Sequence, residues 1–339
     1  MNKIKVWLAR RAERRAAKRQ NAQSAFLLPP AEIAEQFPEI YEKRFKRRYR
    51  VFQIGFFLLL AMIPLTVYMH YDYRVFRLMI AGNYFCTDAL EELYSRHIPD
   101  EHRRNFRRDF DRMVISVVTA ELRGISEDRH TYLYFPQEFS EAVAHDRAVA
   151  RTAYTRVLDD NTVYLYIPNI TLATRDFVEE NRYYLAGYAN LVLDLRGNGG
   201  GWMPAAHSIA NLFLPDGAVI SQTQARLNLL SRTITAEDVP FFDFDKIVIL
   251  QDRRTASAAE TLIMAIAAYV PNVTTIGQTT FGKGTAQVTI PLTGGYALRA
   301  TIMQVLGPDG QSIHNVGVAP DVYLEVGADF LEMVMHLVG

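Results

Sequence analysis

Residues 191–204 read LVLDLRGNGGGWMP, and this short segment joins three kinds of local structure. The apolar run 191–195 predicts a buried strand, glycines follow at its carboxyl end, and a helical pattern begins directly afterwards. Sites in open α/β sheets gather at this edge of the strands. A glycine turn here either exposes N–H groups as an oxyanion hole or makes a tight strand-to-helix connection.

The same alternation extends to both sides of this segment. Apolar strand-like runs alternate with helical runs, which is typical of βαβ units on a largely parallel sheet. The strand-like runs are TVYLYIP (162–168), NLVLDLR (190–196), KIVILQD (246–252) and VTTIG (273–277), and the helical runs are TRDFVEENRYYLAGY (174–188), MPAAHSIANLFL (203–214) and SAAETLIMAIAAY (257–269). Hairpin-like strands follow near the end of the chain. The predicted fold class is α/β, with a mixed, largely parallel sheet and flanking helices.

A different pattern precedes this core. Residues 51–70, VFQIGFFLLLAMIPLTVYMH, contain no Asp, Glu, Lys or Arg and match the roughly 20 helical residues that cross a hydrocarbon core. The basic run KRFKRRYR (43–50) abuts them on one side only, and residues 1–50 carry 14 Lys or Arg against 5 acidic residues. The positive-inside rule then predicts an uncleaved signal anchor in the inner membrane, with the amino terminus cytoplasmic and the rest periplasmic or extracellular. A buried core helix is the alternative.

Four regions follow from these patterns. They are a cytoplasmic basic tail (1–50), a transmembrane signal anchor (51–70), a helical subdomain (71–125) and an αβ core (126–339). Within the tail, residues 1–20 predict either a helix lying on anionic lipid or a solvated basic segment. The lone Cys86 excludes an intramolecular disulfide and is interpreted as a packed thiol. No CxxC or HExxH motif occurs, and no metal or organic cofactor is expected.

Two short motifs near residues 251–287 carry the chemistry. GQTTFGKG (277–284) is one residue away from a phosphate-binding loop, but Gly284 stands where a hydroxyl must hold magnesium. The next residues read as a strand, whereas a phosphate loop must open a helix. Nucleotide binding is therefore disfavoured, and no nucleic-acid partner is predicted.

Ser257, in TASAAE, has two interpretations. Ser257 and Glu260 fit an S-x-x-E capping box at the start of an apolar helix. A helix start also offers free N–H groups and a positive end, which favour an oxyanion beside a nucleophilic serine. Capping and catalysis compete for the same hydroxyl.

A nucleophilic serine needs a base. His130, His207 and His314 lie in the αβ region, but none sits in a triad motif, and each is interpreted as structural. Lys283 is the alternative base if burial lowers its pKa, and its glycine neighbours allow close backbone approach.

The ordered motifs EDRHTYLYFP, DLRGNGGG, TASAAE, TTFGKGTAQ and SIHNVGVAPD resemble the carboxyl-terminal processing proteases, also called tail-specific proteases, over roughly residues 75 to 325. The resemblance implies a serine endopeptidase with Ser257 as nucleophile, Lys283 as general base and Gln287 as the group that orients the lysine. It also implies an oxyanion hole formed by the backbone N–H groups of Gly201 and Ala258. The implied substrates are extracytoplasmic proteins or peptides.

This chain departs from the family pattern in one large respect. Members commonly insert a PDZ domain, a peptide-tail receptor of about ninety residues, between the equivalents of Phe135 and Val163, which are too close here for such a domain. Substrate choice is then expected to depend on an exposed groove or on a partner or adaptor protein, and little on the substrate's last residues. A non-proteolytic binding or scaffold protein of the same fold and a Ser-His hydrolase are the rival interpretations. The oligomeric state is not predicted.

Overall fold

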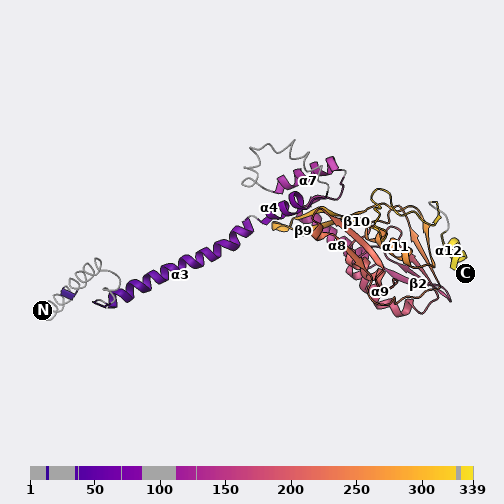
Figure 1. Cartoon of the computed structure of the whole chain (residues 1–339), viewed down its shortest axis with the longest axis horizontal. Helices are drawn as coiled ribbons and strands as arrows, with labels where there is room; N and C mark the ends of the chain where they lie inside the picture. Colours follow the sequence, from indigo (N-terminus) through magenta and orange to yellow (C-terminus); the bar gives the residue numbers. More distant parts are fainter. Residues whose placement is uncertain are drawn as a thin grey trace. The chain divides into compact units, whose positions relative to one another are not determined.

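The computed structural model describes residues 13–14, 35–36, 38–69, 71–85, 112–126, 128–325 and 330–338 (Figure 1). The chain divides into two compact units, Met1–His70 and Tyr71–Gly339. Of the predictions made above, those for Cys86 and for nearly all of residues 1–20 lie outside the described residues.

Helix α3 (Pro38–Met69) is the long element of the first unit and has 32 residues. An 18-residue window of its segment Tyr41–Leu65 has a mean hydropathy of 1.4, and by length and composition the helix is able to cross a membrane. The leucine and phenylalanine side chains of residues 51–65 are largely exposed. The predicted span is thus helical as far as Met69, and the helix also takes in the basic run before it.

A six-stranded sheet organises most of the second unit. Its strand order is β11-β8-β7-β4-β3-β2, and neighbouring strands are parallel except for β2, which pairs antiparallel with β3. The strands are β2 (Tyr154–Asp159), β3 (Thr162–Tyr166), β4 (Asn190–Asp194), β7 (Lys246–Gln251), β8 (Val273–Gly277) and β11 (Val322–Tyr323). Every residue of β4 is buried, as expected for a parallel strand covered on both faces. The predicted alternation of strands and helices is confirmed.

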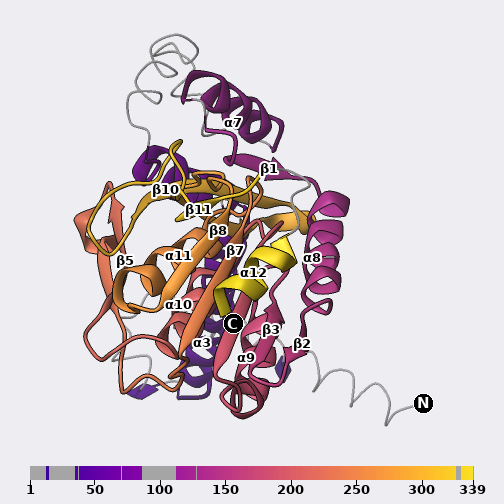
Figure 2. The ribbon, with the colours of Figure 1, turned by 90° about the vertical axis from the view of Figure 1, so that its right-hand side faces the viewer.

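Helices cover both faces of this sheet. Those on one face are α9 (Leu172–Leu185), α10 (Met203–Asn211) and α11 (Ala258–Tyr269), and they share the largest apolar core with β3, β4 and β7. On the other face, Val334 and Val338 of α12 (Phe330–Val338) pack against Val192 and Val248. Figure 2 shows α12 lying over the strands. Helix α12 was not predicted from the sequence.

A second, antiparallel sheet corrects the prediction of a single sheet with added hairpins. It has the order β1-β10-β5-β6, with β9 on the other side of β10. Its strands are β1 (Tyr132–Tyr134), β5 (Val219–Ala225), β6 (Arg232–Thr235), β9 (Thr285–Pro291) and β10 (Ala297–Leu306). β10 pairs with β1 along its first residues and with β5 along its last, and both partners are distant in sequence. The β9–β10 and β5–β6 pairs are local hairpins, and the sequence patterns indicated only the first of them.

The described part of the predicted helical subdomain packs on this second sheet. It consists of α4 (Tyr71–Phe76), a π-helical segment (Arg77–Gly82) and α7 (Arg112–Ser126). Phe76, Ile80, Ile115 and Leu122 share one apolar core with Leu298 of β10. In the described residues, these helices therefore share their apolar core with the sheet that they cover.

Between Phe135 and Val163 the chain forms helix α8 (Pro136–Ala150) and strand β2. This is the place where the family resemblance implied a missing PDZ insertion. A single helix and an edge strand fill it, and α8 reaches the candidate site described next.

Candidate active site

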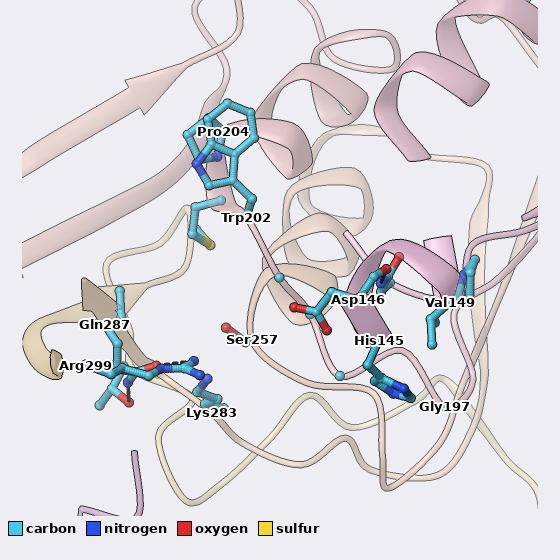
Figure 3. A pocket seen from close by; sticks show the side chains of 18 of the residues that line it. His145, Asp146, Val149, Gly197, Trp202, Pro204, Ser257, Lys283, Gln287 and Arg299 are labelled. Atoms are coloured by element: carbon cyan, nitrogen blue, oxygen red, sulfur yellow. Dashed lines mark hydrogen bonds between the residues drawn. The ribbon is translucent and has the colours of Figure 1, made fainter. Parts of the chain in front are cut away.

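A cavity of about 580 Å³ collects most of the residues singled out in the sequence. Ser257, Lys283, Gln287 and Gly201 all line it. In Figure 3 the Ser257 hydroxyl projects into the cavity, with Lys283 and Arg299 on one side and Asp146 on the other. The walls come from α8, the glycine turn after β4, the loop before α11, and strands β9 and β10.

Ser257 stands immediately before α11 in a backbone conformation that is unusual for a residue with a side chain. Its φ is 58° and its ψ is −119°, and strain of this kind clusters at functional sites. Its backbone N–H donates to the Glu260 carboxylate at 2.6 Å, but its hydroxyl makes no capping hydrogen bond. Only the glutamate half of the predicted capping box forms, which leaves the hydroxyl available to a substrate.

The glycine turn packs directly against the serine loop. Gly200 has a φ of 89°, and a Cβ there would approach the Ala256 carbonyl oxygen to 2.5 Å and the Ser257 Cβ to 2.8 Å. The neighbouring Gly201 forms an isolated bridge with Ile170. Within the described residues, no hydrogen bond uses the N–H of Gly201 or of Ala258. Two free N–H groups beside a serine hydroxyl are what an oxyanion hole requires.

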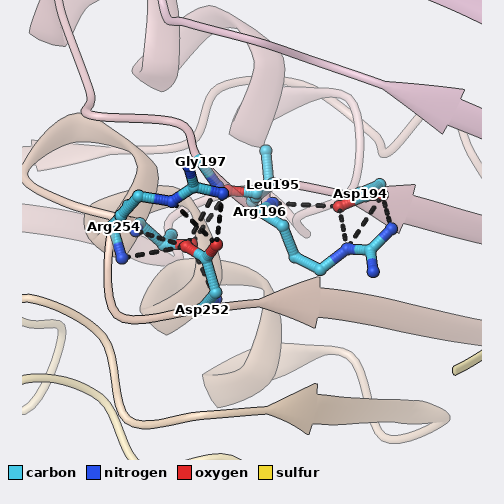
Figure 4. Close-up of polar contacts among 7 residues, drawn as sticks. Asp194, Leu195, Arg196, Gly197, Asp252 and Arg254 are labelled. Atoms are coloured by element: carbon cyan, nitrogen blue, oxygen red, sulfur yellow. Dashed lines mark hydrogen bonds and ion pairs between the residues drawn. The ribbon is translucent and has the colours of Figure 1, made fainter. Parts of the chain in front are cut away.

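Two carboxylates fix this turn, as Figure 4 shows. Asp194 pairs with the Arg196 guanidinium at 2.5 Å and accepts from its backbone N–H at 2.9 Å. Asp252 accepts from the N–H of Gly197 at 3.0 Å and from that of Arg254 at 2.9 Å. These contacts tie the end of β4 to the loop that carries the serine. Although burial opposes the shift, the hydrogen bonds from Gly197 and Arg254 lower the pKa of Asp252.

Lys283 enters the cavity from the loop that precedes β9. Its pKa is lowered to about 8, chiefly by burial and then by the charge of Arg299, whereas Asp128 and Glu260 act in the opposite direction. It makes no salt bridge within the described part of the chain. A lysine with this pKa is substantially neutral near pH 8, and only the neutral amine can accept a proton.

Glu260 connects the serine loop to the lysine loop. It is fully buried, and its carboxylate accepts the N–H of Ser257, that of Gly282 at 2.7 Å and that of Lys283 at 2.9 Å. The Thr280 hydroxyl donates to the same carboxylate. The sequence pattern had indicated only a helix-capping role for Glu260. The S-x-x-E spacing was the available signal, but it did not reveal the second loop.

Gln287 and Arg299 form a linked pair on β9 and β10. The Gln287 side-chain amide donates to the hydroxyls of Thr285 at 3.1 Å and Thr301 at 3.2 Å, and its oxygen accepts from Arg299 at 3.4 Å. No hydrogen bond joins it to Lys283 among the described residues, so its predicted role in orienting the lysine stays a prediction. Arg299 was missed, and its only signal was one charged residue inside the apolar strand run YALRATIMQVL.

The histidines considered as alternative bases lie away from the serine hydroxyl. His130 and His314 line a second cavity of about 230 Å³ on another side of Lys283. The pKa of His130 is lowered to about 4, first by burial and then by the charge of Lys283. The His207 ring bonds the Ser221 hydroxyl at 2.9 Å. His145 of α8, which the sequence analysis did not consider, lines the larger cavity, and Figure 3 draws it on the side away from Lys283.

No group of three His, Cys, Asp or Glu side chains suited to a metal ion occurs in the described ranges. The chemistry available to this cavity is that of a hydroxyl, a lysine of lowered pKa and backbone N–H donors.

Comparisons with known proteins agree on one family. Residues 161–324 match the model of peptidase family S41. The carboxy-terminal processing protease CtpA of Bacillus subtilis is 33% identical over 188 residues, which are 55% of this chain and 40% of that protein. The chloroplastic C-terminal processing peptidase of Tetradesmus obliquus is 34% identical over 157 residues, 45% of this chain and 33% of that protein. The chain thus spans less than half the length of these curated relatives.

The fold is shared with a solved structure. A lipoprotein from Streptococcus agalactiae superposes with a TM-score of 0.55 at 20% identity, covering 74% of this chain and 94% of that one. The photosystem II D1 C-terminal processing protease gives a TM-score of 0.43 at 28% identity, covering 50% of this chain and 44% of that one.

Proposed function

Residues 161–324 are a peptidase family S41 domain, and from this premise we propose that the chain is a membrane-anchored serine endopeptidase acting on extracytoplasmic proteins. The proposed reaction is hydrolysis of peptide bonds through a Ser-Lys acyl-enzyme. Carboxy-terminal processing by the relatives named above supports protein or peptide substrates.

Each step of this reaction uses a group of the cavity. The Ser257 hydroxyl oxygen attacks the substrate carbonyl carbon while neutral Lys283 accepts the hydroxyl proton. The carbonyl oxygen becomes an oxyanion, which the N–H groups of Gly201 and Ala258 stabilise. Lys283 then returns its proton to the departing amine, and the acyl-enzyme forms. Water, deprotonated by Lys283, hydrolyses the ester and restores Ser257.

One observation carries the proposal. The Ser257 hydroxyl makes no capping hydrogen bond and opens into the same cavity as a lysine whose pKa is lowered to about 8. An uncapped serine at a strained helix start is costly for a purely structural residue. A lysine buried without a salt bridge is equally costly. Both costs are explained if these groups act as nucleophile and base.

The proposed location rests on helix α3. Its uncharged residues 51–69 suit a membrane span, and the basic run at residues 43–50 favours a cytoplasmic amino terminus. The catalytic domain would then lie in the periplasm or outside the cell, and a partner or adaptor protein could bring substrates to it. A reporter fused after residue 40 should report the cytoplasm, and one fused after residue 339 the opposite side. Reversed signals would refute this topology.

The reaction itself is tested by trapping its intermediate. The purified full chain is mixed with an unfolded protein substrate and quenched with acid, and the peptide that contains Ser257 is analysed by mass spectrometry. A substrate-derived acyl group on Ser257 is expected in the wild type and should be absent from Ser257→Ala. Cleavage with no acylation, or acylation of another residue, would refute the mechanism.

A further inference from the structure

Arg299 is a partly buried cation with no acidic partner in the described part of the chain. It lies on β10 and lines the cavity that holds Ser257. Its charge also acts on Lys283, so two positive groups stand close together at this end. A cation removed from water normally requires a compensating partner, because burial of a charge is costly.

The contacts that Arg299 does make are weak. Its guanidinium approaches the hydroxyls of Tyr134 at 3.3 Å and Tyr132 at 3.4 Å, and the Gln287 side-chain oxygen at 3.4 Å. Its Nε is buried and has no hydrogen-bond partner. Neutral oxygens at these distances hold the side chain in place without neutralising it. Donor capacity therefore remains for an anion.

The two ends of the cavity differ in charge. Lys283 and Arg299 lie on one side of Ser257, and Asp146 of α8 lies on the other (Figure 3). An anionic group of a peptide that crosses Ser257 is attracted to the first side and repelled from the second. Lys283 must be neutral when it accepts the serine proton, so Arg299 is the permanent cation available to such a group.

We propose that Arg299 binds a carboxylate of the substrate within the active-site cavity and thereby selects which peptides are cleaved. This inference rests on the proposed peptidase function and names its substrate class. The planar guanidinium suits a carboxylate because it offers paired N–H donors. The carboxylate comes either from an Asp or Glu side chain or from a free carboxyl terminus. In the second case the cut falls close to the end of the substrate, because Arg299 and Ser257 line one cavity.

The experiment separates recognition from turnover. Three labelled forms of one short peptide of alanine, leucine and serine are compared: an amidated neutral form, the same peptide with a free carboxyl terminus, and an amidated form with one central glutamate. Binding to full-length Ser257→Ala is measured by fluorescence anisotropy. At least one carboxylate form should bind about tenfold more tightly than the neutral form, which corresponds to one charge-assisted hydrogen bond.

Variants test whether Arg299 causes the tighter binding of carboxylate peptides. Adding Arg299→Gln to Ser257→Ala should abolish the ratio between carboxylate and neutral peptides, and Arg299→Lys should retain part of it. Arg232→Gln, which removes an exposed arginine from β6 of the same sheet, should leave the ratio unchanged. Equal binding of all three peptides, or a ratio that survives Arg299→Gln, would overturn the proposal. A preference for the free carboxyl terminus would also refute the expectation that the last residues matter little.

Turnover by the chain that keeps Ser257 distinguishes the proposed peptidase function from the proposed carboxylate site. The kcat/KM values of the carboxylate and neutral peptides should differ by the same ratio as their affinities. This difference should vanish in Arg299→Gln, although that variant also raises the pKa of Lys283 and so changes turnover of all the peptides. A carboxylate preference in binding with no cleavage of any peptide would refute the proposed peptidase and leave the carboxylate site standing. Cleavage with no preference would refute the carboxylate site alone.

Discussion

The two sheets of the catalytic unit contribute different kinds of groups to one cavity. The parallel sheet supplies Ser257 and the glycine turn, which stand at the carboxyl ends of its strands. The antiparallel sheet supplies Lys283, Gln287 and Arg299, which stand on or next to β9 and β10. In the proposed mechanism, the first sheet thus provides the nucleophile and the oxyanion donors, and the second provides the base and its electrostatic surroundings.

This division means that catalysis depends on how the two sheets are held together. Glu260 provides such a link, because one buried carboxylate accepts N–H groups from both the serine loop and the lysine loop. Replacing Ser257 on the parallel side or Lys283 on the antiparallel side should stop the reaction. Replacing Glu260 should lower both the turnover and the free energy of unfolding.

The largest effect is expected for Ser257→Ala, on the parallel side. Turnover of an unfolded protein substrate should fall by about 10⁴-fold or more, as when other serine nucleophiles are removed. The free energy of unfolding should change little, because the hydroxyl makes no capping hydrogen bond. Denaturant titration and a cleavage assay measure the two quantities.

Thr171→Ala is the matched control, because the Thr171 hydroxyl does cap α9 by accepting the Thr174 N–H at 3.2 Å. It should lose about 1 kcal/mol of stability and keep its turnover. A stability loss of that size in Ser257→Ala would show that the serine is mainly a cap.

On the antiparallel side, Lys283→Arg should lose about 10³-fold in turnover while remaining folded. Arginine keeps the positive charge, but its guanidinium does not deprotonate in the working range and cannot accept the serine proton. Lys246→Arg at the exposed start of β7 is the control and should behave as wild type. Near-normal cleavage by a folded Lys283→Arg would exclude the lysine as base and return attention to the histidines.

Glu260→Gln tests the link between the sheets. The amide oxygen can accept some of the four donated hydrogen bonds, but its NH₂ group faces donors, so buried N–H groups lose partners. We expect a loss of about 3 kcal/mol in the free energy of unfolding together with a reduced turnover.

The control is Glu237→Gln, which changes an exposed acid and should alter neither quantity. Unchanged stability in Glu260→Gln would mean that the sheets are held together by other contacts.

The smallest effect concerns pH. Because the proposed base is the neutral amine of Lys283, kcat/KM should rise with pH and level off above about pH 8, following the lowered pKa of this lysine. Arg299→Gln removes a charge that lowers this pKa, so the midpoint should move to higher pH. At pH 7 each unit of such a shift costs about tenfold in the neutral fraction. A midpoint that does not move, or that moves down, would show that Arg299 does not act on the base.

The six-stranded sheet was predicted from the sequence more completely than the antiparallel sheet. Between residues 162 and 277, the strands of the six-stranded sheet and the helices that follow them were predicted, because hydrophobic periodicity is local and because most of these elements pack on neighbours in the chain. Strands β5 and β6, which lie in the same range, were not predicted. The antiparallel sheet was only partly foreseen. β10 finds β1 and β5 across long sequence separations, and no local pattern encodes such pairings. For the same reason the described helices of residues 71–125 were assigned to a subdomain instead of to the core beneath β10.

The sequence by itself determined which motifs the proposed chemistry uses: a serine before an apolar helix, a lysine between glycines and a glycine turn after a buried strand, in the order typical of one protease family. Only the tertiary structure placed Ser257 and Lys283 in one cavity, made Glu260 the link between their loops and set Arg299 beside the base. The physical reason is that burial and charge act through space. The pKa of a lysine depends on the groups packed around it, and those groups come from strands distant in sequence.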